Sequence, residues 1–219
     1  MKRTLSKRRS LRPNSFTLVE LLVVMGIIAI LASAVTISAS AAIKAAKRAK
    51  AANMANQLQT AVLGYYTEYS VYPIPTNAAA GDYLLADKAA NAADWKDMVT
   101  ALCGNIDPYT GTTYTASKVG NSRSIAFLSL KKADVDANTA PLNPIPTGTA
   151  IYFNLAIDGS YDGILGSATG SVDLPDIANA TSTANPAVKG GTSTAGVAVW
   201  ANCNGSTTSY NPAFWVKTY

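Results

Sequence analysis

The chain has 219 residues, enough for one domain with an appended element, and 48% of them are hydrophobic, so a substantial core is expected. Its formal charge of +5 is unevenly placed: six of the 18 basic residues precede Phe16, and the 12 that follow are matched by 13 acidic residues. Most of the chain therefore lacks the positive charge of nucleic-acid-binding proteins. Histidine is absent. Without this common general base and metal ligand, no enzymatic activity is predicted.

A long apolar segment follows the basic N-terminus. Residues Leu21 to Ile43 include no charged residue and no proline. As a helix these residues would extend about 35 Å, enough to cross a bilayer, and we predict a membrane span at about residues 18–43. The apolar run is longer than that of a secretory signal peptide. Glu20 stands near its start, where a carboxylate is costly unless it has a partner or a purpose. The plain alternative is a signal anchor that tolerates Glu20.

The run Ser15-Phe16-Thr17-Leu18-Val19-Glu20 before the apolar segment resembles the leader motif of type IV pilins and type II secretion pseudopilins. The resemblance implies that a prepilin peptidase cleaves between Ser15 and Phe16, removes residues 1–15 and methylates the new amine of Phe16. The family strongly prefers glycine where this chain has Ser15. The resemblance also implies an inner-membrane assembly platform and further copies of the chain as partners.

Glu20 has a physical role in such an assembly. A carboxylate at membrane depth can be neutralised by the ammonium that cleavage creates on Phe16. Within one helix the two groups are four residues apart. In the family that the motif resembles, the amine of an incoming subunit meets the glutamate of a resident one. Such a pair would select the correct stacking, because an unpaired charge there is strongly unfavourable.

Basic residues flank the predicted span on both sides. Six precede it, and four follow it: Lys44, Lys47, Arg48 and Lys50. The larger leader predicts a cytoplasmic N-terminus and a single-pass inner-membrane protein before assembly, and a periplasmic or cell-surface filament afterwards. We interpret the second cluster as a charged face above the headgroups. Salt bridges to adjacent subunits, or binding of a polyanion such as DNA, are the alternatives.

The helix is expected to continue beyond the span. Apolar residues recur every three or four positions from Ala51 to Tyr72, which predicts an amphipathic helix packed on a sheet. A single helix over residues 16–72 would end at Pro73 and Pro75. Residues 73–219 are then expected to form an extracytoplasmic globular domain.

The sequence of this outer domain predicts a short helix followed by strands. Asp82 or Asp94 would cap a helix that ends near Gly104 and presents Trp95, Met98, Val99 and Leu102 on one face. Strands are predicted at residues 124–130, 150–157 and 196–200. The predicted fold class is α+β, a long N-terminal helix on a small antiparallel sheet. This order of elements is similar to the C-terminal domain of major pseudopilins.

An acidic loop is a candidate calcium site. Asp158, Ser160, Asp162 and the carbonyl of Ile164 stand at positions one, three, five and seven of a calcium-loop pattern. The twelfth position is Thr169, so Asp173 or Asp176 would have to complete the coordination. An Asp- and Gly-rich turn between strands is the alternative. No other cofactor is predicted.

Cys103 and Cys203 are the only cysteines. Outside the cytoplasm an isolated pair more often forms a disulfide than stays reduced. Two unrelated small core residues are the alternative. A catalytic role is not expected because the chain has no histidine to form a thiolate pair.

These observations support three hypotheses. The first is a structural subunit of a type IV pilin-like filament, specifically a type II secretion pseudopilin. Within the family, the rival is a surface pilus subunit for adhesion, motility or DNA uptake. The third, from a different class, is a membrane-anchored binding domain that never polymerises, which would retain residues 1–15.

Overall fold

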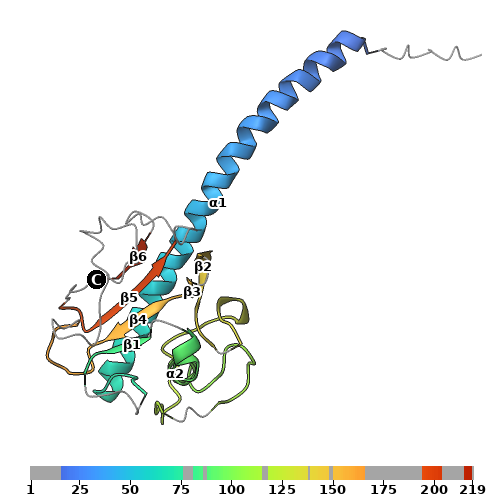
Figure 1. Ribbon diagram of the computed structural model, residues 1–219. Helices are drawn as coiled ribbons and strands as arrows, with labels where there is room; N and C mark the ends of the chain where they lie inside the picture. The colour runs from blue at the N-terminus through green and yellow to red at the C-terminus, as the bar shows by residue number, and fades with distance from the viewer. Residues whose placement is uncertain are drawn as a thin grey trace, which may run out of the picture. The chain divides into compact units, whose positions relative to one another are not determined.

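The structure is a computed structural model, and it describes residues 16–75, 81–85, 88–114, 118–137, 139–147, 150–165, 194–203 and 215–218. One long helix, a second helix and short antiparallel strands make it an α+β protein, which confirms the predicted fold class (Figure 1). By internal contacts the chain divides into two units, Met1–Lys44 and Ala45–Tyr219.

Helix α1, Leu18–Tyr69, is 52 residues long. It ends where Ser70 adopts a left-handed backbone with φ of 57°. Pro73 follows, and proline cannot continue a helix because it lacks the amide hydrogen. The predicted helix over residues 16–72 is thus confirmed to within three residues at each end.

In the unit Met1–Lys44 the helix is apolar on all sides. Every side chain described from Phe16 to Val35 is exposed. By length and composition α1 is the one described helix that could cross a membrane, and its most apolar window buries none of its surface. A helix that is apolar all round needs lipid or other helices around it.

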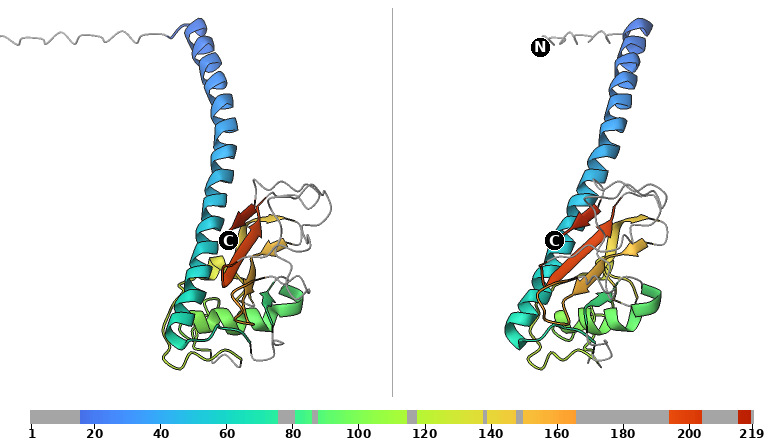
Figure 2. Two further views of the ribbon diagram at one scale, coloured as in Figure 1. Left: turned by 90° about the vertical axis from the view of Figure 1, so that its left-hand side faces the viewer. Right: turned by 60° about the vertical axis from the view of Figure 1, so that its left-hand side comes forward.

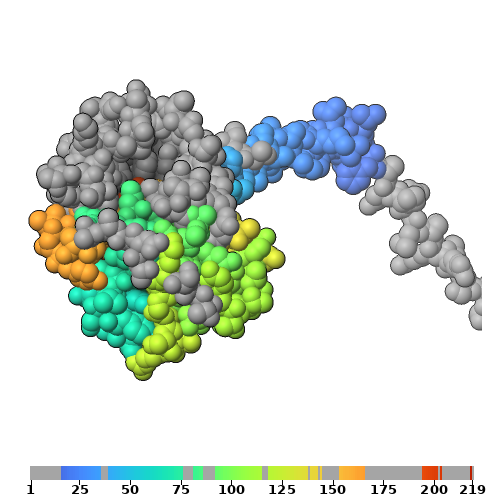
Figure 3. Space-filling view, turned by 60° about the horizontal axis from the view of Figure 1, so that its bottom comes forward, coloured from blue at the N-terminus to red at the C-terminus, as the bar shows by residue number. Residues whose placement is uncertain are grey.

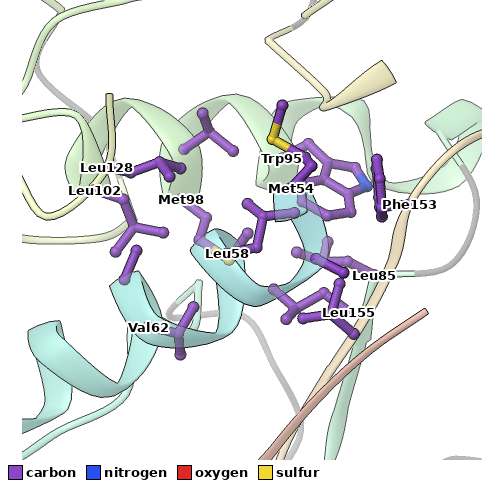
Figure 4. Close-up of a cluster of buried hydrophobic side chains, with 14 of the residues drawn as sticks. Met54, Leu58, Val62, Leu85, Trp95, Met98, Leu102, Leu128, Phe153 and Leu155 are labelled. Atoms are coloured by element: carbon purple, nitrogen blue, oxygen red, sulfur yellow. The ribbon is translucent and has the colours of Figure 1, made fainter. Parts of the chain in front are cut away.

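In the unit Ala45–Tyr219 the same helix contributes one face to the core. The buried residues recur every three or four positions and are Ala51, Met54, Ala55, Leu58, Ala61, Val62 and Tyr65. Figure 4 shows Leu58 among Met98 and Trp95 of the second helix and Leu85 of the first strand. Because this half of α1 is part of the core, the compact unit begins at Ala45 rather than at residue 73, where the sequence placed the domain boundary.

Four strands form the main antiparallel sheet, in the order β1-β4-β5-β6. Their bounds are Tyr83–Leu85, Asn154–Ile157, Val197–Asn202 and Trp215–Lys217. Leu155 pairs with Val199 at the centre, and both side chains lie in the main core. The next pair, Ala156 with Ala198, belongs to a smaller cluster with Trp200 and Leu165. Both faces of the sheet are therefore covered.

The sheet lies against the second half of α1, as both views in Figure 2 show. Gln59 of α1 links the helix to the sheet. Its Nε2 donates hydrogen bonds to the carbonyl oxygens of Val197 (2.9 Å) and Thr218 (3.3 Å). A separate two-stranded sheet pairs β2, Leu142–Thr147, with β3, Ala150–Tyr152.

Helix α2, Lys88–Leu102, covers the core from another direction. Its predicted apolar face is confirmed, because Trp95, Met98, Val99 and Leu102 are fully buried. Its end is also confirmed: Gly104 has φ of 74°, as a terminating glycine requires. The predicted cap is wrong, since Asp82 precedes β1 and Asp94 lies inside the helix, where it contacts Lys118 Nζ at 2.7 Å.

Two of the three predicted strands differ from the structure. Strand β5 confirms the prediction at 196–200. Residues 150–157 form two strands, because the buried Phe153 separates β3 from β4. Residues 124–130 are not a strand. The amides of Phe127 and Leu128 both donate to the carbonyl oxygen of Leu102, so this segment caps the end of α2. Further along, residues Lys132–Asp134 form a 3-10 helix.

Candidate functional site

The predicted processing site lies at the start of α1. Phe16 is 77% exposed and precedes the first helical residue by two positions. Ser15 and the rest of the predicted leader, residues 1–15, lie outside the described residues. An exposed, non-helical Phe16 is compatible with cleavage before it, because a peptidase must bind the chain in an extended form.

Glu20 has a partner within its own helix that the sequence analysis missed. Its Oε2 accepts hydrogen bonds from the Thr17 hydroxyl (2.7 Å) and the Thr17 amide (2.9 Å), and the Glu20 amide donates to the Thr17 hydroxyl at 3.3 Å. This reciprocal arrangement is a capping box. The signal was present in the sequence as a threonine three residues before a glutamate at the start of an apolar run.

The capping box places the carboxylate at the first turn of α1. The N-terminus of a helix carries a partial positive charge, so it favours an acidic side chain there. In the structure Glu20 therefore belongs to the helix start next to Phe16, where the predicted new amine would appear. The predicted assembly residues Phe16 and Glu20 therefore lie at the same end of α1, together with Thr17.

The comparisons with known proteins find the same segment. Residues 12–36 match the family model of the prokaryotic N-terminal methylation motif. The chain carries a pilin-type methylation motif. The match includes Phe16 and Glu20 and extends to residue 36 of the predicted span at residues 18–43. No curated protein and no solved structure matches the chain. The resemblance of the outer domain to major pseudopilins therefore has no support from these comparisons.

The methylation motif and the apolar helix together fit a membrane-anchored, single-pass protein. The exposed apolar side chains of α1 begin at the motif. They include Leu21, Leu22, Ile27, Ile28, Ile30, Leu31 and Ile43. The motif and the surface that requires burial are thus continuous along one helix.

The basic cluster after the span is partly engaged within the subunit. Lys50 Nζ lies 2.7 Å from Asp134 Oδ1 in the following domain. The Lys50 side chain is exposed, and an ion pair with an exposed partner contributes little to stability. Lys44 and Lys47 are exposed. The interpretation of the cluster as a charged face above the headgroups stays a prediction.

The candidate calcium loop is closed by its own backbone. Asp158 is buried, and its carboxylate accepts hydrogen bonds from the amides of Tyr161 (2.7 Å) and Gly163 (3.0 Å) and from the Ser160 hydroxyl (3.0 Å). Asp162 accepts one from the amide of Ile164 at 2.8 Å. These are the contacts of the turn alternative.

The calcium assignment to Asp158, Ser160, Asp162 and Ile164 stays a prediction. Within the described part of the chain, no group of three or more acidic, cysteine or histidine side chains is placed to hold a metal ion. The side chains expected to complete the coordination, Asp173 and Asp176, lie outside the described residues.

Tyrosine rings anchor this loop to the end of α1. The Tyr161 hydroxyl accepts a hydrogen bond from the Tyr72 amide at 3.0 Å, and the two rings stack with centroids 5.4 Å apart. Tyr66 stacks on Tyr72 at 4.5 Å. Figure 3 shows the loop after β4, in orange, beside the teal end of α1. Next to Asp158 the loop also packs closely on the backbone of Gly81, since a Cβ at Gly159 would lie 2.3 Å from the Gly81 carbonyl oxygen.

The two cysteines are buried in the same cluster of apolar side chains. No disulfide joins them in this structure, and their pairing stays a prediction. Burial raises the pKa of the Cys103 thiol to about 11. Cys103 is consequently protonated at neutral pH and reacts slowly in the folded protein.

Oxidation outside the cytoplasm is expected to join Cys103 to Cys203. A disulfide closing a loop of about a hundred residues would stabilise the domain by about 4–5 kcal/mol. Peptide mapping under non-reducing conditions tests this, with Cys103→Ala as the control that must leave Cys203 free. If both thiols of freshly isolated, denatured protein are fully alkylated, the expectation is wrong.

Proposed function

We propose that the protein is a structural subunit of a type IV pilin-like filament, processed by a prepilin peptidase and without enzymatic activity of its own. The observation that carries the proposal is the match of residues 12–36 to the methylation motif, at the start of a 52-residue helix. The motif concerns processing, and the helix supplies a surface for assembly.

The exposed apolar half of α1 supports polymerisation. Its side chains would lie in lipid before assembly and against the same helices of other copies afterwards. Both environments remove apolar surface from water, which is the main favourable term in association. The subunit could therefore leave the bilayer without exposing this half of the helix to water.

The pairing of charges would give the assembly its register. After cleavage, Phe16 carries an ammonium group, and Glu20 holds its carboxylate at the same end of the helix through Thr17. An incoming ammonium group that reaches a resident Glu20 is neutralised, whereas one that stops a turn short is not. The uncompensated charge would disfavour the wrong axial position.

The finer assignment is a pseudopilin of a type II secretion system, which would polymerise from an inner-membrane assembly platform to drive protein export. Its basis is the resemblance of the sequence-predicted order of elements to major pseudopilins, an order in which the structure replaces the strand predicted at residues 124–130 by a cap on α2. A surface pilus subunit is the rival. Abundant fibres in sheared cell-surface material at native expression would favour the pilus, and their absence, together with loss of protein export on deletion, would favour the pseudopilin.

The mature protein is expected to begin with N-methylated Phe16. The small Ser15 before the cut, the run Thr17 to Glu20 after it and the basic leader together match the peptidase pattern. Intact-mass analysis of purified membrane protein, with and without the peptidase gene, measures the N-terminus. Retention of Met1, or a cut near Ala32–Ala34, would contradict the proposed function and favour an anchor or a secreted protein.

A further inference from the structure

An uncharged groove of about 340 Å³ lies on the outer domain, between α1 and the segment after α2. Its lining residues are Asn53, Asn56, Gln57, Thr60, Phe127, Leu128 and Ser129. The volume lies at the lower end of the range for small-molecule sites. No motif of the N-terminus and no step of the proposed assembly involves this groove.

The helical wall of the groove is built from amides and a hydroxyl. Asn53, Asn56, Gln57 and Thr60 are all exposed, and none has a hydrogen-bond partner among the described residues. Each amide offers two donors and an acceptor with two lone pairs. The wall runs over eight residues, from Asn53 to Thr60, about 10 Å along the helix. It therefore presents unused donors and acceptors side by side.

This composition is unusual for the outer face of a helix. From Ala51 to Thr67 α1 includes no charged residue, although its outer face is exposed. Asparagine and threonine are poorer helix formers than alanine, lysine or glutamate, because they lose side-chain freedom or compete for backbone hydrogen bonds. The choice of Asn53, Asn56 and Thr60 therefore favours a role in binding over helix stability.

The opposite wall is a positioned aromatic ring. Phe127 packs edge-on against Tyr65 and Tyr69, with centroid distances of 5.7 and 6.3 Å. Gly64 makes room for it, since a Cβ at this position would lie 3.2 Å from the Phe127 ring. A glycine inside a helix is destabilising relative to alanine. Here it allows the ring to approach the helix at the end of the amide wall.

We propose that this groove binds a neutral saccharide. Sugar hydroxyls both donate and accept hydrogen bonds, which matches the amides of Asn53, Asn56 and Gln57. The polarised C–H groups of a sugar ring suit the negative face of an aromatic ring such as Phe127. The absence of charged side chains from the lining disfavours an anionic ligand. One or two sugar rings fit the length of the wall.

The test uses the full chain in phosphatidylcholine nanodiscs, because maltoside detergents would themselves present a disaccharide. The probes are maltose, lactose and N,N′-diacetylchitobiose, with glucuronic acid as the charged comparison, titrated by saturation-transfer NMR. We expect at least one neutral disaccharide to bind saturably with a Kd of about 1 mM or below, and glucuronic acid not to bind.

The decisive variant is Asn56→Ala combined with Gln57→Ala. Alanine is the best helix former, so the change should leave the fold intact while removing two hydrogen-bonding side chains. We expect saccharide affinity to fall at least about tenfold. Thr67→Ala, on the same helix outside the groove, is the matched control and should bind as wild type does.

Two results would overturn the proposal. One is no saturable binding of any of the three neutral disaccharides up to about 10 mM. The other is equal binding by wild type and the double variant. If no saccharide binds and the double variant also lowers filament yield, the groove receives a second copy of the chain instead. Cleavage before Phe16 is measured on the same samples, so failure of the proposed function is seen separately.

Discussion

Glu20→Val is expected to insert into the membrane and to be cleaved like the wild type, yet to lower filament yield at least about tenfold. Removing a carboxylate from the apolar span favours insertion. The predicted cleavage site before Phe16 lies outside that span. Assembly should fail because the Phe16 ammonium of each incoming subunit would lack its counter-charge at membrane depth.

The structure adds a second consequence of this substitution, because Glu20 also completes the capping box with Thr17. Thr17→Val separates the two roles: it removes the hydroxyl but keeps the carboxylate, and we expect it to retain most of the yield. Glu20→Gln keeps an acceptor but loses the charge, and should be intermediate.

The measurement is the yield of sheared filaments relative to processed, membrane-inserted protein, in cells without wild-type copies. Normal yield from Glu20→Val would show that the carboxylate has no assembly role. It would favour the anchored-domain alternative or a subunit that needs no such pairing. If instead Thr17→Val fails as completely as Glu20→Val, the cap rather than the charge would explain the effect.

Asn121→Ala is expected to destabilise the outer domain by about 3 kcal/mol or more. The Asn121 side chain is buried and makes four hydrogen bonds that join three parts of the domain. Its Nδ2 donates to the carbonyl oxygens of Ala101 (2.6 Å) and Ile125 (2.9 Å). Its Oδ1 accepts from the Tyr69 hydroxyl (2.7 Å) and the Ile125 amide (3.1 Å).

The size of this effect follows from what the truncation leaves behind. Each buried polar group that loses its partner costs about 1–3 kcal/mol, and alanine would leave several unpaired at once. Asn121→Asp keeps the shape and the two acceptor contacts, but it turns a carboxylate oxygen toward the carbonyl oxygens of Ala101 and Ile125. We expect it to be at least as destabilising.

Denaturant unfolding of the full chain in detergent measures the loss of stability. Tryptophan fluorescence reports the unfolding, because Trp95 lies in the core. The neighbouring Ser122→Ala is the control: Ser122 is exposed, and its change should stay within about 0.5 kcal/mol of wild type. A loss of less than about 1 kcal/mol for Asn121→Ala would show that water replaces the lost partners.

The N-terminal half of the candidate site could be predicted from the sequence because its signals are local. The run from Ser15 to Glu20, the 23 uncharged residues after it and the basic leader need no knowledge of distant residues. The C-terminal end of the helix follows from Pro73 and Pro75, and its buried face follows from a spacing of three or four residues. The Thr17–Glu20 capping box was equally local, and it was missed because Glu20 was interpreted only as an assembly charge.

The outer domain depended on contacts between residues distant in sequence. Residues 124–130 have the alternation of a strand, but they cap α2, because the Leu102 carbonyl and Asn121 bind their amides. The division of 150–157 at Phe153 likewise depends on which neighbouring strand each half meets.

By itself, the sequence determined the methylation motif, the long helix and its apolar half, since helix formation and membrane partition depend on neighbouring residues and their spacing. Only the tertiary structure decided the strand boundaries, the closure of the Asp158 turn and the groove beside Phe127. Each of these joins groups far apart in the chain: Phe127 approaches Gly64 across 63 positions, and no local pattern specifies such a pairing.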